Sequence, residues 1–274
     1  VDVQTQKDSM IRNATRVIFN VDRGEKVRIK DINFYGNDGV KDFTPARAMK
    51  KTKSNKFYNF FSSKKFNEKE YPNDKNNMIS KFQEAGYRDA RIIRDSIYYV
   101  EPGRLAIDFE FDQGKKYYFR DITWTGNSVY STNDLNEILK IKKGDPYDVV
   151  TMKHRLSGGG KQTDQDVAKI YRDNGYLFFD INPVELNITG DSVDVEIRVT
   201  EGKQATLNNI VINGNDLTSE KVVRRQIFTR PGYLFSQSDF ERSIREIASL
   251  GQFDPEAIAG EGGYSIIPNQ MNNT

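Results

Sequence analysis

The sequence predicts an α+β protein of tandem repeats, each a three-stranded mixed sheet backed by two helices, in an elongated arrangement. Three observations predict this class. A pair of glycines recurs three times at nearly constant spacing, apolar residues alternate with period two around each pair, and helical periodicity fills the intervals. One repeat therefore reads strand, helix, helix, strand, strand, over about 90 residues.

The three similar stretches are residues 17–37, 107–127 and 195–215. In each, the second glycine follows the first by 12 residues, and an asparagine comes directly after it. Glycine and asparagine both accept a positive φ, so the pair predicts a turn that closes the repeat's first strand. These turns are Gly36-Asn37, Gly126-Asn127 and Gly214-Asn215.

The alternation of apolar residues predicts strands with one buried face before the first glycine of each copy and between the two glycines. Between the glycines the alternation slips by one residue at the same place in every copy, as from Ile29 to Ile32 and from Phe119 to Ile122. A slip reverses the faces of a strand unless a bend or a bulge absorbs it. We therefore expect an irregularity at this point of each repeat.

The interval between copies predicts two helices and a further strand. A longer helix should end in a glycine cap at Gly86, Gly175 and Gly251, although Ser243 interrupts the apolar pattern of the third. Shorter helices are expected at 44–52, 131–140 and 218–228, and strands at 90–100 and 178–188. The glycines 158–160 are expected to form a flexible start to the second helix, because their surroundings do not match a phosphate-binding loop.

The spacing divides the chain into four parts. Residues 1–24 are the C-terminal hairpin of a preceding repeat, and 25–113 are a complete repeat with an insertion near 53–71. Residues 114–202 are a second complete repeat, and 203–274 are a last repeat that lacks its final strand. We interpret the chain as part of a longer protein.

Composition argues against several functions. Lys and Arg number 41 and Asp and Glu 39, a balance that argues against a dedicated nucleic-acid surface. The absence of cysteine excludes disulfides and thiolate metal sites, and the single His154 argues against histidine-rich zinc sites and Ser–His catalysis. We expect no catalytic, cofactor-binding or metal-binding residues, and no cofactor.

The repeat, with Gly-Asn after its first strand and Gly-Tyr after its second helix, resembles the POTRA domain over essentially the whole chain. The string RRQIFTRPGYLFSQSDFERSIREIASLGQFDPE (224–256) resembles the last POTRA domain before the barrel of BamA-type, Omp85-family outer-membrane assembly factors. Residues 174–185 and the stretch 53–66 are similar to Bacteroidetes-type chains.

The resemblance implies a non-enzymatic arm on the periplasmic face of the bacterial outer membrane. Its partners would be unfolded outer-membrane protein precursors, accessory outer-membrane lipoproteins of the assembly complex and its own C-terminal membrane barrel. Nucleic acid is not an expected partner.

The candidate peptide-binding site is a strand edge. The last two strands of each repeat should form a hairpin, with one of them in the centre of the sheet and the strand after the second helix at an edge. Unpaired backbone groups at such an edge can receive an extended peptide. By analogy with the family, the candidate residues lie in the strand 90–100 and are Arg91, Ile93, Asp95 and Ile97. The alternative is an ordinary edge strand whose charged side chains discourage pairing with another chain.

Two further surfaces are candidates for contacts. The family resemblance suggests a lipoprotein contact at Arg224, Arg225 and Gln226, although Gln226 departs from the family's Arg-Arg-Glu; the alternative is a solvated helix face. A basic and aromatic stretch predicts contact with an anionic membrane or an acidic partner, the alternatives being packing on its own unit or nucleic acid. It contains Lys56, Phe57, Tyr58, Phe60, Phe61, Lys64 and Lys65.

The sequence leaves competing functions open. The near alternative is the POTRA arm of another Omp85 transporter, of the two-partner secretion or TamA-like kind. A periplasmic enzyme would instead need a deep pocket with convergent polar groups. A cell-division scaffold would carry a single POTRA domain.

Overall fold

The computed structural model describes residues 2–7, 15–20, 27–41, 43–49, 66–158, 165–215, 217–259 and 263–267. The chain forms two compact units. The first comprises Val1–Lys81 and Ala90–Gln113, and the second comprises Phe82–Asp89 and Gly114–Thr274. One border between these units lies between residues 113 and 114, and the predicted division into four parts stays a prediction.

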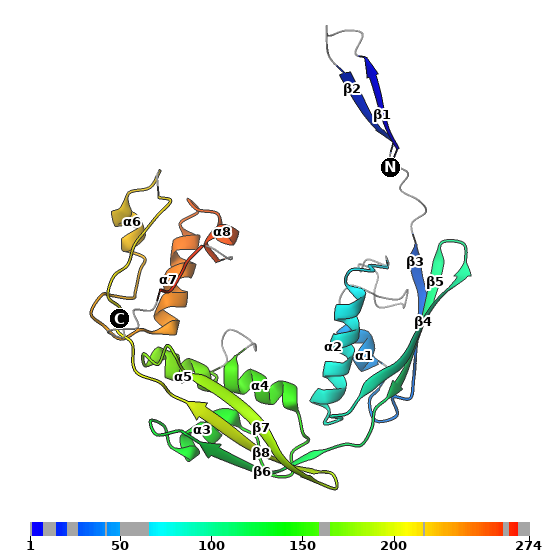
Figure 1. Cartoon of the computed structure of the whole chain (residues 1–274), viewed down its shortest axis with the longest axis horizontal. Coiled ribbons are helices and arrows are strands. Elements are labelled where there is room, and N and C mark those ends of the chain that lie inside the picture. Colours follow the sequence, from blue (N-terminus) through cyan, green and yellow to red (C-terminus); the bar gives the residue numbers. More distant parts are fainter. Residues whose placement is uncertain are drawn as a thin grey trace. The chain divides into compact units, whose positions relative to one another are not determined.

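The first unit holds a hairpin and a three-stranded sheet. Strands β1 (Asp2–Lys7) and β2 (Thr15–Asn20) form an antiparallel pair. The sheet has the order β3-β5-β4, where β3 is Arg28–Tyr35, β4 is Arg91–Glu101 and β5 is Arg104–Asp112. Strand β5 is parallel to β3 and antiparallel to β4, which makes the sheet mixed. Helices α1 (Phe43–Ala48) and α2 (Tyr71–Glu84) lie on one face of it (Figure 1).

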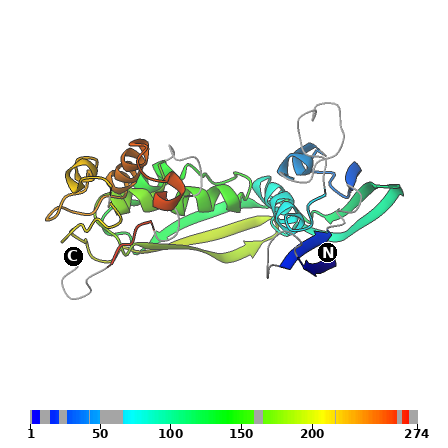
Figure 2. The ribbon, with the colours of Figure 1, turned by 90° about the horizontal axis from the view of Figure 1, so that it is seen from above.

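The second unit repeats this plan. Its sheet has the order β6-β8-β7, with β6 at Tyr118–Thr125, β7 at Asp180–Thr189 and β8 at Ser192–Thr200. Helices α3 (Thr132–Leu139), α4 (Val149–Ser157) and α5 (Val167–Asp173) belong to this repeat, and α4 and α5 lie along one face of the sheet (Figure 2). The predicted α+β class with mixed three-stranded sheets is therefore confirmed.

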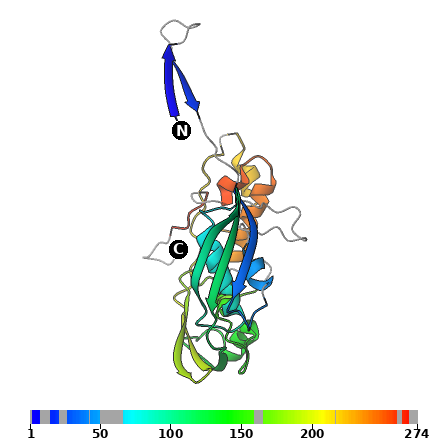
Figure 3. The same ribbon diagram turned by 90° about the vertical axis from the view of Figure 1, so that its right-hand side faces the viewer.

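Both sheets place the same strand at their centre. The central strand is β5, which precedes Gly114, or β8, which precedes Gly202. The strand that follows the second helix, β4 or β7, lies at an edge. Figure 3 shows the strands of the first sheet side by side, with β3 in blue. The predicted edge position of residues 90–100 is confirmed.

The predicted slip in the alternation is absorbed by a β-bulge in both sheets. The pairing register shifts between Ile29 and Asp31 in β3 and between Phe119 and Asp121 in β6. One extra residue therefore restores the buried face. Both extra residues are basic: Lys30 pairs with Glu101 at 2.5 Å, and Arg120 pairs with Asp194.

The Gly-Asn turns have the same geometry in all three copies. Each glycine has a positive φ, between 74° and 82°, whereas no asparagine does among the described residues. Each asparagine acts through its side chain instead, because its amide donates to the carbonyl oxygen three residues later. These bonds join Asn37 to Val40, Asn127 to Tyr130 and Asn215 to Thr218, at 2.9, 3.0 and 3.0 Å.

Helix α4 was not predicted. Asp148 caps its start by accepting a hydrogen bond from the Thr151 amide at 2.8 Å, and Gly158, with a φ of 86°, caps its end. Gly158 therefore ends one helix instead of starting the next. Residues 159–164 lie outside the described part of the chain.

The last repeat has helices α6 (Glu220–Arg224), α7 (Gln237–Ser249) and α8 (Pro255–Ala259). The predicted strand at 205–212 does not form a ladder, and an isolated bridge joins Thr206 to Leu234. The corresponding strands β3 and β6 each pair with a central strand, and no described residue supplies one here. Ser243 is buried and accepts a hydrogen bond from the Phe228 amide at 2.8 Å, which explains a polar residue at an apolar position of the helix.

Candidate peptide-binding edge

Strand β4 has one neighbour, β5, and within the described residues no strand pairs with its other side. The backbone amides and carbonyls on that side are thus available to another extended chain. Two bulges interrupt the strand, between Ile92 and Arg94 and between Tyr99 and Glu101. The regular part of the edge is therefore the six-residue segment Arg94–Tyr99, which we call the β4 edge.

The bulge at Ile93 separates the four predicted site residues. Arg91 is opposite Asp112 and forms an ion pair with it at 2.8 Å, on the face of the sheet away from the helices. Asp95 and Ile97 are opposite Phe109 and Ile107, which are fully buried on the helix side. The structure therefore brings Asp95 and Ile97 together on one face and does not bring Arg91 to them.

The carboxylate of Asp95 binds its own unit. Its Oδ2 accepts a hydrogen bond from the Tyr71 hydroxyl at 2.8 Å and lies 3.2 Å from the Lys75 ammonium, both in helix α2. Burial raises the pKa of Tyr71, and the hydrogen bond to Asp95 raises that pKa further. Asp95 therefore attaches the edge strand to the helix.

The other face of the β4 edge is polar and self-paired. Arg94 forms an ion pair with Glu110 at 3.2 Å. The hydroxyl of Tyr98 donates to Asp108 at 3.2 Å, and Asp108 also accepts from the Asn33 amide at 2.8 Å. These contacts hold β4 on its sheet without using its outer backbone groups.

Apolar side chains gather along β4. Ile93 is 59% exposed, Ile97 42% and Tyr99 67%, and Tyr98 and Val100 are also exposed. Sequence reasoning did not select Tyr98, Tyr99 and Val100. The run Ile97–Val100 contains only β-branched and aromatic residues, and that was the available signal.

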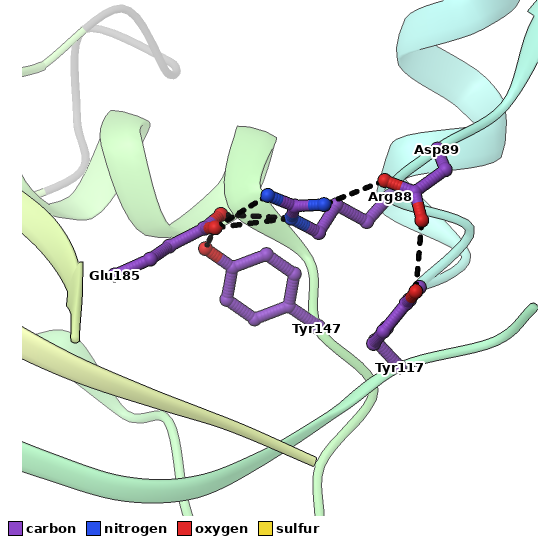
Figure 4. Close-up of polar contacts among 5 residues, drawn as sticks. All are labelled: Arg88, Asp89, Tyr117, Tyr147 and Glu185. Carbon is purple, nitrogen blue, oxygen red and sulfur yellow. Dashed lines mark hydrogen bonds and ion pairs between the residues drawn. The ribbon is translucent and has the colours of Figure 1, made fainter. Parts of the chain in front are cut away.

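The corresponding edge of the second sheet, β7, is less open. It contains Pro183, which has no amide to donate and is tolerated in a sheet only at an edge or a bulge. Glu185 of β7 is bound by the guanidinium of Arg88 and the hydroxyl of Tyr147 (Figure 4). Of the two edges, β4 is therefore the one in which every residue has a backbone amide to donate.

The residues predicted to contact a lipoprotein lie around the end of helix α6. Arg224 forms an ion pair with Glu220 at 2.5 Å, one helical turn earlier. Arg225 is exposed, and its side chain makes no hydrogen bond or ion pair with a described residue, whereas Gln226 is half-buried. The basic and aromatic residues between Lys56 and Lys65 lie outside the described part of the chain.

The described residues hold no group of three or more His, Cys, Asp or Glu side chains that could bind a metal ion. None of the described helices combines the length and the apolar character that crossing a membrane requires.

Tandem mixed sheets with helices on one face and an open edge strand define a repeat-built α+β module. The sequence matches the POTRA family, described as a surface antigen variable number repeat, over residues 117–202 and 205–269. The chain belongs to this family, and it is similar to the POTRA regions of BamA-type outer-membrane assembly factors of the Omp85 family.

Relatives and solved structures agree with this assignment. A putative outer membrane protein assembly factor of Treponema pallidum is 28% identical over 86% of this chain and 28% of its own length. BamA of Neisseria meningitidis is 24% identical over 93% of this chain and 31% of its own length, so the chain spans less than a third of each relative. The crystal structure of Haemophilus influenzae BamA POTRA3-5 matches with a TM-score of 0.64 at 16% identity, over 85% of this chain and 90% of that one.

Proposed function

We propose that this chain is the periplasmic arm of an outer-membrane β-barrel assembly factor that binds unfolded outer-membrane protein precursors by strand addition at the β4 edge. The observation that carries the proposal is the outer side of Arg94–Tyr99 between two bulges, with which no described strand pairs. Both curated relatives carry the assembly-factor name, which supports this choice over the arm of a two-partner secretion or TamA-like transporter.

The two faces of the β4 edge suit a strand with alternating side chains. Ile97 and Tyr99 are exposed on the helix side, and Arg94, Ser96 and Tyr98 lie on the other face. A strand added beside them would place apolar side chains against Ile97 and Tyr99, and polar ones against the opposite row. Strands of membrane barrels alternate in this way.

The expected affinity is low. Five backbone hydrogen bonds at ~1 kcal/mol net each would supply roughly 5 kcal/mol before the costs of ordering the peptide. This corresponds to a Kd on the order of 0.1–1 mM. Weak binding that depends mainly on the backbone suits a precursor that must be passed on.

The test titrates the isotope-labelled 274-residue chain with a ten-residue peptide copied from a strand of an outer-membrane barrel. We expect chemical-shift changes at Arg94–Tyr99, and none when alternate peptide amides are N-methylated, because N-methylation removes the donors. Ile97→Lys should weaken binding. The matched change Ile188→Lys, at a similarly exposed position of β7, should not.

Two results would remove the proposal. One is the absence of shifts at millimolar peptide. The other is an equal response to the N-methylated peptide, because side-chain contacts alone would then explain the binding.

Docking of accessory lipoproteins at Arg224, Arg225 and Gln226 belongs to the same proposal. The exposed and uncommitted side chain of Arg225 supports it more than Arg224, which is paired with Glu220. Contact of the segment Lys56–Lys65 with a membrane or partner, attachment to a C-terminal barrel and a Bacteroidetes-like lineage stay predictions.

A further inference from the structure

The segment Gly86–Asp89 connects helix α2 to strand β4 and is seated on the second unit, to which it belongs. The Tyr117 amide donates to the Gly86 carbonyl at 2.8 Å. Gly86 has a φ of 94°, and an added Cβ would lie 3.1 Å from the Tyr117 carbonyl oxygen and 3.2 Å from Pro146. The backbones therefore approach closely at this point.

Two side chains of this segment, Arg88 and Asp89, belong to a polar cluster of five residues (Figure 4). The Arg88 guanidinium donates to both carboxylate oxygens of Glu185, through Nε at 3.0 and 3.1 Å and through Nη2 at 2.6 Å. The Tyr147 hydroxyl donates to the same carboxylate at 2.7 Å. Arg88 Nη1 also donates to Asp89 at 2.6 Å, and Asp89 accepts from the Tyr117 hydroxyl at 2.8 Å.

The following repeat has the same backbone contact with different side chains. The Ala205 amide donates to the Gly175 carbonyl at 2.7 Å, as the Tyr117 amide does to Gly86. The residues at the positions of Arg88, Tyr117 and Tyr147 are Leu177, Ala205 and Phe235. The Asp173 carboxylate accepts hydrogen bonds from the Ser236 hydroxyl and from the amide and hydroxyl of Ser238, and no ion pair between described residues joins this second contact.

We propose that the Arg88–Glu185 ion pair is a latch that holds the segment Gly86–Asp89 on the second unit and can open while the repeat stays folded. The corresponding contact at Gly175 is held by hydrogen bonds to the Gly175 carbonyl and to Asp173, and it has no such ion pair among the described residues. Arg88 and Glu185 are each about a third exposed, with side-chain exposures of 32%, so salt weakens their attraction. The Gly175 contact offers salt no pair of opposite charges to screen.

The test measures amide hydrogen exchange of the whole 274-residue chain, because each contact has its own reporter. The Tyr117 amide reports on the Gly86 contact, and the Ala205 amide reports on the Gly175 contact. In Arg88→Ala and Glu185→Gln we expect the Tyr117 amide to exchange roughly tenfold faster, since a bond to a charged group is lost from a partly exposed site. In the double variant the Tyr117 amide should exchange no faster than in Arg88→Ala. In Arg88→Lys its exchange rate should be intermediate, since lysine keeps the charge but cannot donate two hydrogen bonds to the carboxylate as the guanidinium does.

A matched control uses the neighbouring, more exposed pair Arg91–Asp112. Arg91→Ala should leave Tyr117 exchange unchanged. Raising salt to 1 M, where the Debye length is about 3 Å, should speed Tyr117 exchange in the unaltered chain and leave Ala205 unchanged.

Three results would overturn the latch. They are unchanged exchange at Tyr117 in Arg88→Ala, an equal increase at Ala205, and an equal increase at the buried Val195 of β8. The last would show that Arg88 stabilises the whole repeat and does not act locally.

Discussion

Asp95 shows how a charged residue on an edge strand can serve the fold. It was predicted to face a ligand, yet Tyr71 and Lys75 of helix α2 bind its carboxylate. The Tyr71 ring also stacks on Phe109 at a centroid distance of 6.0 Å. The side chain therefore holds the edge strand in place, and the strand's backbone remains for binding.

We expect Asp95→Ala to lower the free energy of unfolding of the first unit by about 1–3 kcal/mol, because it leaves the buried Tyr71 hydroxyl without its acceptor. Urea denaturation followed through NMR signals of β5 measures this loss. Asp112→Ala removes a more exposed ion pair and should cost less than about 1 kcal/mol. Equal losses in the two variants would contradict the role given to Asp95.

Glu185 makes the latch sensitive to acid. Hydrogen bonds from Arg88 lower its pKa below the ordinary value of 4.5, burial opposes this, and the Tyr147 hydroxyl adds to the lowering. A carboxylate with a lowered pKa stabilises the folded state above its ordinary pKa, and the contribution is lost as the pH falls through the lowered value. Arg88, Tyr147, Asp89 and Tyr117 are the charged and titratable groups of the cluster around it.

We therefore expect protection of the Tyr117 amide to be constant from pH 7 down to about 4.5 and to decline below it. In Arg88→Ala the decline should be absent and the pKa of Glu185 should be higher. Carboxyl NMR titration with parallel hydrogen exchange measures both quantities. A Glu185 pKa at or above 4.5 in the unaltered chain would contradict this assignment.

Edge strands show why alternation alone misassigns faces. The four residues predicted for the site, Arg91, Ile93, Asp95 and Ile97, are alternate positions of the sequence, and in a regular strand they would share one face. The bulge at Ile93 adds a residue and reverses every position before it relative to those after it. In β3 and β6 the bulge was detectable because it interrupts a buried apolar pattern. On an exposed edge no such pattern marks it.

The Gly-Asn turns of the second and the last repeat differ in the space around their glycines. A Cβ on Gly126 would lie 2.1 Å from the Val199 carbonyl oxygen, whereas a Cβ on Gly214 meets nothing within 4 Å. Both glycines have a positive φ, near 80°. A substituted residue would thus meet the same backbone strain at both positions, and only at Gly126 would its Cβ also clash.

We expect Gly126→Ala to destabilise the second unit by about 3 kcal/mol or more, from a positive φ and a clash with backbone. Gly214→Ala should cost only about 1–2 kcal/mol, from the positive φ alone. Fluorescence of Trp124, which is buried beside the turn in β6, follows unfolding of this unit in urea. Similar losses would show that strain and not contact governs the turn.

At the scale of the whole molecule, repetition made the chain predictable. Three copies in register indicated strand order, bulge and turn together, because each copy tests the interpretation of the others. The element missed, α4, begins after its cap Asp148, at the repeat position where α7 begins after its cap Ser236. The apolar pattern counted back from Gly175 and Gly251 detected α5 and the end of α7, and it does not reach the start that α4 and α7 share.

The sequence by itself determined the repeat, its α+β class and its edge strand, because apolar periodicities within a few residues recur at a spacing of about 90 residues. Only the tertiary structure showed that helix α2 binds the Asp95 carboxylate and that Arg91 lies on the face of the sheet away from the helices. It also showed that Arg88 binds Glu185, 97 positions later in the sequence. Such pairings depend on strand register and on which repeat a segment rests against. Both are set by packing between distant parts of the chain, which no local pattern records.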